Sequence, residues 1–234
     1  ILLIAEEMLS SAAAQNIQYI ECYFTPTTFA LFNVQTKDLF DGLIAAETLA
    51  KMKYQIELQW IFDIVRNVSR DGAETLVLAR AARKQGVAVY SIGLAGYEAQ
   101  GSARMFATAF EIARAEGFRT LAHAGETGGA ESVRETIEVL KPDRIGHGIR
   151  ALEDPAVLGL LIESQIPIEV SPWSNIALQL TSIENHPLAK MVEAGVNVIL
   201  AADDPGIFQR DLTDNFVYAA ERGISLETLT KLAA

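Results

Sequence analysis

Positive charge, cysteine and histidine are all scarce in this chain. Its 234 residues include 19 Lys and Arg against 30 Asp and Glu, for a formal net charge of −11 at pH 7. A surface of this sign repels nucleic-acid phosphates and anionic lipids, which argues against binding to either. The one cysteine, Cys22, has no second cysteine for an internal disulfide, so the fold does not require an oxidising compartment and we expect a cytoplasmic protein.

Long apolar runs are missing as well. No stretch approaches the roughly 18 consecutive apolar residues that a membrane helix needs. The apolar opening, residues 1–5, is followed at once by Glu6 and Glu7 and has no basic residue before it, so it does not resemble a signal peptide. Because the chain begins with Ile1 and not with methionine, we expect a preceding segment.

Seven short runs rich in β-branched and aromatic residues predict strands. They begin near Ile17, Ile56, Val87, Arg119, Asp143, Ile166 and Asn197. Their average spacing of about 30 residues is the length of a strand followed by a helix. This rhythm predicts an α/β protein with a mostly parallel sheet.

Segments with helical spacing of apolar residues lie between these runs. Helices are expected over residues 1–15, 103–115 and 131–140, and a further helix is expected to start at Asp154, with Pro155 in its first turn. In the second of these helices, the apolar side chains that share one face are Met105, Phe106, Ala109 and either Ile112 or Ala113.

The number of strands favours a particular fold. Seven strands alternating with helices, and an opening helix with no strand before it, predict a (β/α)8 barrel of the TIM type that lacks its first strand in this chain. An open doubly wound sheet is the alternative. No linker or low-complexity segment divides the sequence, so we expect a single barrel domain over residues 1–234, incomplete at its N-terminus.

Polar residues gather where the predicted strands end. The fourth run ends in residues 123–126 (His-Ala-Gly-Glu), the fifth in 146–148 (Gly-His-Gly), the sixth in 171–175 (Ser-Pro-Trp-Ser-Asn) and the seventh in 203–205 (Asp-Asp-Pro). In parallel-strand barrels, the carboxyl ends of the strands form the active site. Two of the chain's three histidines therefore fall where an active site is expected.

Each of these residues also has a purely structural interpretation. A histidine after a strand is commonly a hydrogen-bonded structural residue, and Asp204-Pro205 alone is typical of a turn or a helix cap. The third histidine, His186, lies in a polar connection away from any predicted strand end, and we expect no functional role for it. The functional hypothesis depends on the combination of residues and not on any one of them.

The combination suits a metal-dependent hydrolase. Zinc binds His and Asp, and a zinc site that keeps one position open for water lowers the pKa of that water to about 7. His123 and Asp203 would supply two ligands, and Glu126 could then donate a proton. A catalytic zinc generally has at least three protein ligands, so we expect the others from the absent first strand.

In this order, the four strand-end motifs resemble those of the adenosine deaminase family of the amidohydrolase superfamily. The similar part extends from about Tyr19 to the C-terminus. The resemblance implies a (β/α)8 barrel with one zinc ion per chain that deaminates an adenine-type nucleoside by hydrolysis, adenosine to inosine with release of ammonia. It implies a small adenine-containing substrate and is compatible with a homo-oligomer.

The resemblance also implies a role for each matching residue. His123 and Asp203 would be zinc ligands. Glu126 would protonate the ring nitrogen beside the carbon under attack. His147 would orient the attacking hydroxide and stabilise the charge that develops there, with Asp203 assisting as a base.

Two further residues would contact the substrate, and the sequence departs from the family pattern nearby. Asp204 would hydrogen-bond the imidazole part of the purine, and Gly96 would contact the pyrimidine part through its backbone. Gly93 stands where the family usually has an Asp. The His-X-His pair of the family's first strand does not occur in this chain, so we expect two further histidine ligands from the missing strand.

Substrate and reaction both have alternatives. Residues 60–64 (Trp-Ile-Phe-Asp-Ile) and 125–127 (Gly-Glu-Thr) resemble a bacterial branch that includes aminodeoxyfutalosine deaminases, and free adenine is a third candidate substrate. Another amidohydrolase could cleave an ester, a lactone or a ring amide with the same metal site, but a ring-protonating Glu126 suits a purine. A rival of another class is a non-catalytic barrel that serves as a binding module, and the presence of Glu126, His147 and both aspartates argues against it.

Overall fold

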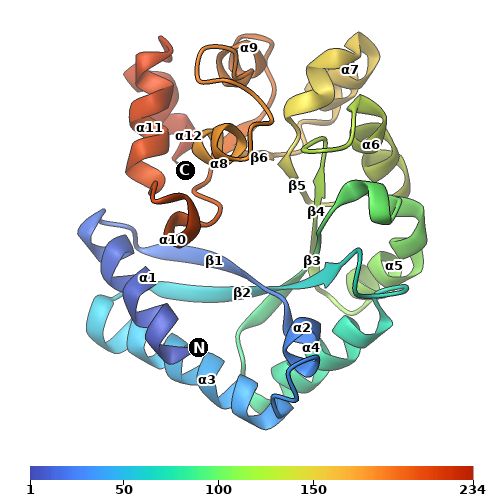
Figure 1. Ribbon diagram of the computed structural model, residues 1–234, viewed down its shortest axis with the longest axis vertical. Coiled ribbons are helices and arrows are strands. Elements are labelled where there is room, and N and C mark those ends of the chain that lie inside the picture. The colour runs from blue at the N-terminus through green and yellow to red at the C-terminus, as the bar shows by residue number, and fades with distance from the viewer. Residues whose placement is uncertain (234) are drawn as a thin grey trace. The chain divides into compact units, whose positions relative to one another are not determined.

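Seven strands pair in parallel in the order of the chain. The computed structural model describes residues 1–233 (Figure 1). The strands are β1 (Tyr19–Phe24), β2 (Glu57–Val65), β3 (Val89–Ala95), β4 (Arg119–Ala124), β5 (Arg144–His147), β6 (Ile168–Val170) and β7 (Val198–Leu200). Each strand pairs with the next one along the chain. A doubly wound sheet would reverse this order at a switch point. The topology therefore confirms the prediction of a (β/α)8 barrel that lacks its first strand in this chain.

The described residues form two compact units, of which the first comprises Ile1–Gly96 and Met105–Thr120. Its helices are α1 (Leu2–Ala14), α2 (Pro26–Ala30), α3 (Thr36–Leu49), α4 (Ala73–Gln85) and α5 (Ala107–Ala115), and a π-helical turn over Ala50–Tyr54 continues α3. Strand β2 pairs with both β1 and β3, and its five consecutive side chains from Trp60 to Ile64 are buried. Burial on both faces is typical of a parallel strand that helices cover.

The second unit comprises residues 97–104 and 121–233. Its helices are α6 (Ala130–Glu135), α7 (Pro155–Ser164), α8 (Pro172–Ala177), α9 (Leu188–Glu193), α10 (Pro205–Phe208), α11 (Leu212–Glu221) and α12 (Leu226–Leu232), and a π-helical turn over Thr136–Leu140 continues α6. The expectation of one domain stays a prediction. Within residues 1–233, no helix is long and apolar enough to cross a membrane.

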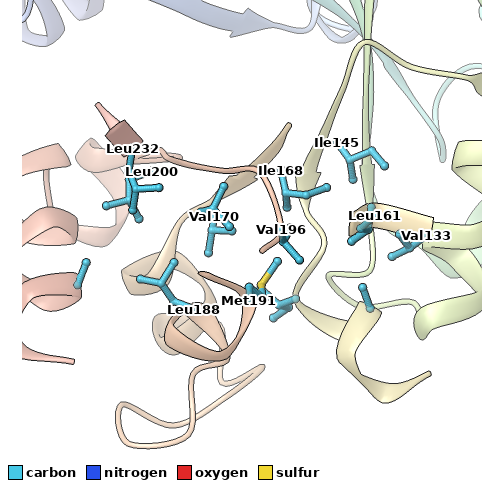
Figure 2. Close-up of a cluster of buried hydrophobic side chains, with 14 of the residues drawn as sticks. Val133, Ile145, Leu161, Ile168, Val170, Leu188, Met191, Val196, Leu200 and Leu232 are labelled. Atoms are coloured by element: carbon cyan, nitrogen blue, oxygen red, sulfur yellow. The ribbon is translucent and has the colours of Figure 1, made fainter. Parts of the chain in front are cut away.

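The hydrophobic core of the second unit lies between its strands and its helices (Figure 2). The buried side chains from the strands and from α6, α7 and α9 include Ile145, Ile168, Val170, Leu200, Val133, Leu161, Leu188 and Met191. Full burial of such a side chain contributes roughly 1.5–3 kcal/mol. This core therefore holds the ends of β4 to β7, where the polar motifs lie, in a defined position.

The helix predicted over residues 103–115 is confirmed, but its buried face differs from the prediction. Ala103–Phe106 form a 3-10 turn, and α5 begins only at Ala107. The buried side chains are those of Ala103, Phe106, Ala109, Phe110 and Ala113. Of the two alternatives at the end of the face, Ala113 is buried and Ile112 is exposed, and Met105 is exposed contrary to the prediction. A 3-10 turn has three residues per turn where an α-helix has 3.6, so the first turn rotates Met105 away from the core.

The predicted helix start at Asp154 and the predicted helix over residues 131–140 are confirmed, and one predicted strand end is wrong. The Asp154 side chain caps α7 by accepting a hydrogen bond from the Ala156 backbone N–H at 2.8 Å. Residues 131–140 are helical throughout, with a π-helical second half. The sixth run divides, because Pro172 begins α8 directly after β6, and residues 171–175 therefore start a helix instead of ending a strand.

The Asp63 side chain of β2 occupies the space that a side chain on Gly93 of β3 would need. Gly93 is paired with Asp63, and a Cβ on Gly93 would overlap the buried Asp63 carboxylate oxygen Oδ1. We expect Gly93→Ala to lower the free energy of unfolding by about 1–3 kcal/mol, measured by urea denaturation. The control is Gly159→Ala in α7, where an added Cβ meets open space and alanine favours the helix. Equal stability of the two variants would contradict this account of Gly93.

Candidate functional site

The register of two neighbouring strands brings two predicted site residues together. Strand β4 pairs with β5 so that His123 lies opposite Gly146 and Ala124 lies opposite His147. A Cβ on Gly146 would lie 2.8 Å from His123 Cδ2, so glycine makes room for the imidazole ring. The His123 and His147 rings pack edge to face with their centroids 4.8 Å apart.

Glu126 completes a group of three possible ligands. His123, Glu126 and His147 each offer one ligand atom, and these atoms all lie within 4.8 Å of one another. His147 Nε2 lies 3.7 Å from Glu126 Oε1, which is longer than a hydrogen bond. Asp203, which the sequence analysis paired with His123 as a zinc ligand, is not a member of this compact group. The assignment of Asp203 as a ligand stays a prediction.

The backbone is strained at two of the site residues. His147 has φ +67° and Asp203 has φ +57°, which places both in the left-handed region that residues other than glycine rarely adopt. Such a conformation costs of order 1–3 kcal/mol and persists only where the surrounding structure enforces it. The strain therefore marks both residues as functional candidates independently of their side-chain chemistry.

Burial shifts the two titratable partners in opposite directions. Burial raises the pKa of the Glu126 carboxyl above its ordinary value, and the negative charges of Asp203 and Glu98 raise this pKa further. His123 acts on Glu126 in the opposite direction. Burial lowers the pKa of the His147 imidazole. The same burial thus makes the carboxyl a weaker acid and the imidazole a weaker base.

The two aspartates after β7 lie in an acidic pair. Asp203 accepts a hydrogen bond from the Ser174 hydroxyl of α8. Burial raises the pKa of Asp204, and the neighbouring Asp203 carboxylate adds to this shift. Gly96 is the other predicted substrate contact, and it ends the stretch Ile1–Gly96 of the first unit. Its backbone is left-handed, with φ +90°. The substrate contacts of Asp204 and Gly96 stay predictions.

Glu98 is a residue that sequence reasoning missed. Its buried carboxylate accepts hydrogen bonds from four consecutive backbone N–H groups, those of residues 125–128, at 2.8–2.9 Å. It also accepts one from the Ser132 hydroxyl. Burial alone would raise the pKa of Glu98, but these hydrogen bonds outweigh it and lower the pKa to about 2. Glu98 therefore fixes, as an anion, the loop that carries Glu126.

Asn175 and His186 are two further residues that the structure brings to the site. Asn175 in α8 is fully buried, and its amide nitrogen lies 3.2 Å from His147 Nδ1. His186 Nε2 lies 3.1 Å from the Asn175 amide oxygen. From the sequence we expect no role for His186, because no strand ends near it. Only the folded connection between α8 and α9 places it against Asn175.

Comparison with known proteins establishes the family. The site combines histidines and carboxylates at the carboxyl ends of parallel strands, where the active sites of (β/α)8 barrel enzymes lie. The family model described as Adenosine deaminase matches residues 1–234. The chain belongs to the adenosine deaminase family, and this confirms the resemblance inferred from the four motifs.

Individual relatives agree with this assignment. The aminodeoxyfutalosine deaminase of Streptomyces avermitilis is 34% identical over 231 residues, which are 95% of this chain and 64% of the relative. The crystal structure of an adenine deaminase from Arthrobacter aurescens matches with TM-score 0.90 and 28% identity, over 98% of this chain and 70% of that one. An amidohydrolase from Burkholderia ambifaria with bound zinc matches with TM-score 0.88 and 25% identity, over 98% and 65%.

The chain is shorter than these proteins. It spans 60 to 66% of the length of the first three curated relatives that it matches. Curated relatives that are 34–36% identical to it carry two names, adenine deaminase and aminodeoxyfutalosine deaminase.

The hydrogen bonds of Glu98 predict a pH-dependent contribution to stability. The folded-state pKa of about 2 lies below the ordinary value of 4.5, so this contribution is complete well above pH 4.5 and is lost as the pH falls toward 2. We expect Glu98→Gln to lower the free energy of unfolding by roughly 3 kcal/mol at pH 7, measured by urea denaturation. The deficit relative to wild type should shrink at pH 3.

The control for this prediction is Glu131→Gln, which makes the same chemical change on an exposed side chain. It should leave the free energy of unfolding within about 0.5 kcal/mol of wild type. A Glu98→Gln deficit that stays the same at pH 3 and pH 7 would show that the carboxylate charge does not stabilise the loop.

Proposed function

We propose that the protein containing this chain deaminates an adenine-type base by hydrolysis. The observation that carries the proposal is the pairing of Glu126 with His147, whose facing atoms lie 3.7 Å apart. The pKa of the carboxyl is raised and the pKa of the imidazole is lowered by the same burial. A carboxyl with a raised pKa beside a neutral imidazole is better suited than an ordinary carboxyl to protonate a ring nitrogen.

Each site residue has a role in this reaction. Glu126 donates its proton to the ring nitrogen beside the carbon that carries the amino group, and this makes the carbon more electrophilic. His147 orients the oxygen nucleophile, and Asp203 accepts the proton of the nucleophile. Asp204 hydrogen-bonds the other part of the purine. The oxygen adds to that carbon, Asp203 passes the proton that it accepted to the amino group, and the C–N bond breaks so that the amino group leaves as ammonia.

The donor set fits a zinc ion. The imidazoles of His123 and His147 and the carboxylate of Glu126 lie within 4.8 Å of one another, and imidazole and carboxylate are groups that zinc binds. Of these three residues only His123 would be a ligand, because Glu126 and His147 act on the substrate and on the nucleophile. In the proposal, His123 and Asp203 hold one zinc per chain, and further histidines come from a preceding segment. When bound, zinc lowers the pKa of water and so supplies a nucleophile at neutral pH. The zinc-containing relative from Burkholderia ambifaria supports this choice of metal.

The names of the relatives guide the choice of substrate. The curated relatives are adenine and aminodeoxyfutalosine deaminases, and both substrates present the same adenine ring as adenosine does. We therefore propose a substrate that contains the adenine ring. Adenine and aminodeoxyfutalosine are the first candidates, and adenosine is the next. The partner is a small molecule, in agreement with a net charge of −11 that disfavours nucleic acid.

Ammonia release and metal content test this function on one sample. We expect the protein containing this chain to release ammonia from at least one of adenine, aminodeoxyfutalosine and adenosine, and to contain about one zinc per chain by elemental analysis. Zinc without turnover would indicate a different amidohydrolase substrate. Neither zinc nor turnover would contradict the proposed function and favour a binding module.

Two substitutions separate the proton donor from the metal ligand. Glu126→Gln removes a proton and should retain zinc while kcat falls by about 100-fold or more. His123→Ala should lose both zinc and turnover. Glu131→Gln, on the exposed surface of α6, is the matched control and should leave both unchanged. If Glu126→Gln retained most of its kcat, Glu126 would not be the acid.

A further inference from the structure

The buried side chains of His147, Asn175 and His186 form a continuous hydrogen-bonded line. His147 Nδ1 lies 3.2 Å from Asn175 Nδ2, and Asn175 Oδ1 lies 3.1 Å from His186 Nε2. The line ends where the backbone N–H of Leu188 donates to His186 Nδ1 at 3.2 Å. Asn175 is completely buried, and His147 and His186 are 4% and 7% exposed.

The backbone group at the end of the line determines the direction of every bond in it. The Leu188 N–H can only donate, so His186 Nδ1 carries no proton. Burial lowers the pKa of His186 to about 4, so its ring is neutral near pH 7 and its single proton lies on Nε2. That N–H donates to the Asn175 amide oxygen.

The orientation of the Asn175 amide in turn determines which nitrogen of His147 carries the proton. With its oxygen occupied by His186, Asn175 turns its NH2 group toward His147 and donates to Nδ1. His147 Nδ1 is then an acceptor and carries no proton, so the ring holds its one proton on Nε2, the atom that faces Glu126. The opposite tautomer of His147 would require a flipped amide, which would set the NH2 group of Asn175 against the N–H of His186.

We propose that His186 is a positioning residue that, through Asn175, holds His147 with its proton on Nε2. The effect of this tautomer on catalysis rests on the proposed deaminase function. In that reaction an Nε2–H group donates a hydrogen bond to the oxygen nucleophile and to the charge that develops there, while the proton of the nucleophile goes to Asp203. His147 is thus the hydrogen-bond donor and not the base.

The surroundings hold His186 in this position. Its ring packs edge to face on Tyr218 of α11 with the centroids 5.9 Å apart. The Tyr218 hydroxyl in turn donates to the Ile183 backbone carbonyl at 2.8 Å. Since Asn175 is fully buried, loss of the His186 donor would leave its amide oxygen unpaired, and the amide could then turn.

A pair of variants at His186 tests the positioning role by kinetics. His186→Phe keeps an aromatic ring against Tyr218 but removes both nitrogens, and His186→Gln offers an amide that can accept from Leu188 and donate to Asn175. We expect His186→Phe to lower kcat by about 10-fold or more, with KM and zinc content within about 2-fold of wild type. His186→Gln should recover most of the lost kcat.

Melting curves show whether both variants are folded. Wild-type kcat in His186→Phe would overturn the proposal. Equal loss of kcat in His186→Phe and His186→Gln, with both variants folded, would overturn it as well, because the role would then be packing and not hydrogen bonding.

The tautomer itself is a second readout that does not depend on turnover. In protein with 15N-labelled histidine, we expect His147 to show a protonated Nε2 and an unprotonated Nδ1, with the signals assigned by their loss in His147→Asn. Asn175→Asp replaces the amide by a carboxylate that only accepts, so the proton of His147 should move to Nδ1.

The NMR result separates the two proposals. A wild-type His147 with its proton on Nδ1 would overturn the positioning role even in an active deaminase. The expected tautomer in a protein that deaminates no adenine compound would leave the line of hydrogen bonds intact and contradict the proposed function alone.

Discussion

The hydrogen-bonded register between β4 and β5 is the constraint on which the site depends. It sets His123 opposite Gly146 and Ala124 opposite His147, so two imidazoles meet at the ends of adjacent strands. A shift by one residue would turn one of these rings to the other face of the sheet. The apolar core favours this register, because the buried side chains of β5 and β6 belong to one hydrophobic cluster and a shift by one residue would turn them to the other face of the sheet.

The same burial has three different electrostatic results in one region of the protein. Glu98 stays ionised because four backbone N–H groups and a hydroxyl replace the water that it loses. Glu126, with less compensation and with other carboxylates nearby, has a raised pKa. His147 has a lowered pKa and is neutral. Local hydrogen bonding, and not depth alone, therefore decides which group can hold a transferable proton.

Much of the architecture could be predicted from local sequence patterns. The alternation of strands and helices, the cap at Asp154 and the strand-end motifs follow from propensity and periodicity, which act over a few residues. The errors have local causes too. Pro172 converted a predicted strand end into a helix start, and a 3-10 turn rotated Met105 out of the core. Neither effect changes the hydrophobic pattern from which the prediction was made.

The sequence by itself determined the family, the fold and the residue types of the site, because four motifs in a given order at strand ends carry that information. Only the tertiary structure decided which side chains support them. Glu98 lies 28 residues before Glu126, and His186 lies 11 residues after Asn175, and no periodicity links either pair. Their roles arise from hydrogen bonds between segments that meet only in the folded chain, and such contacts depend on three-dimensional distance and not on spacing along the sequence.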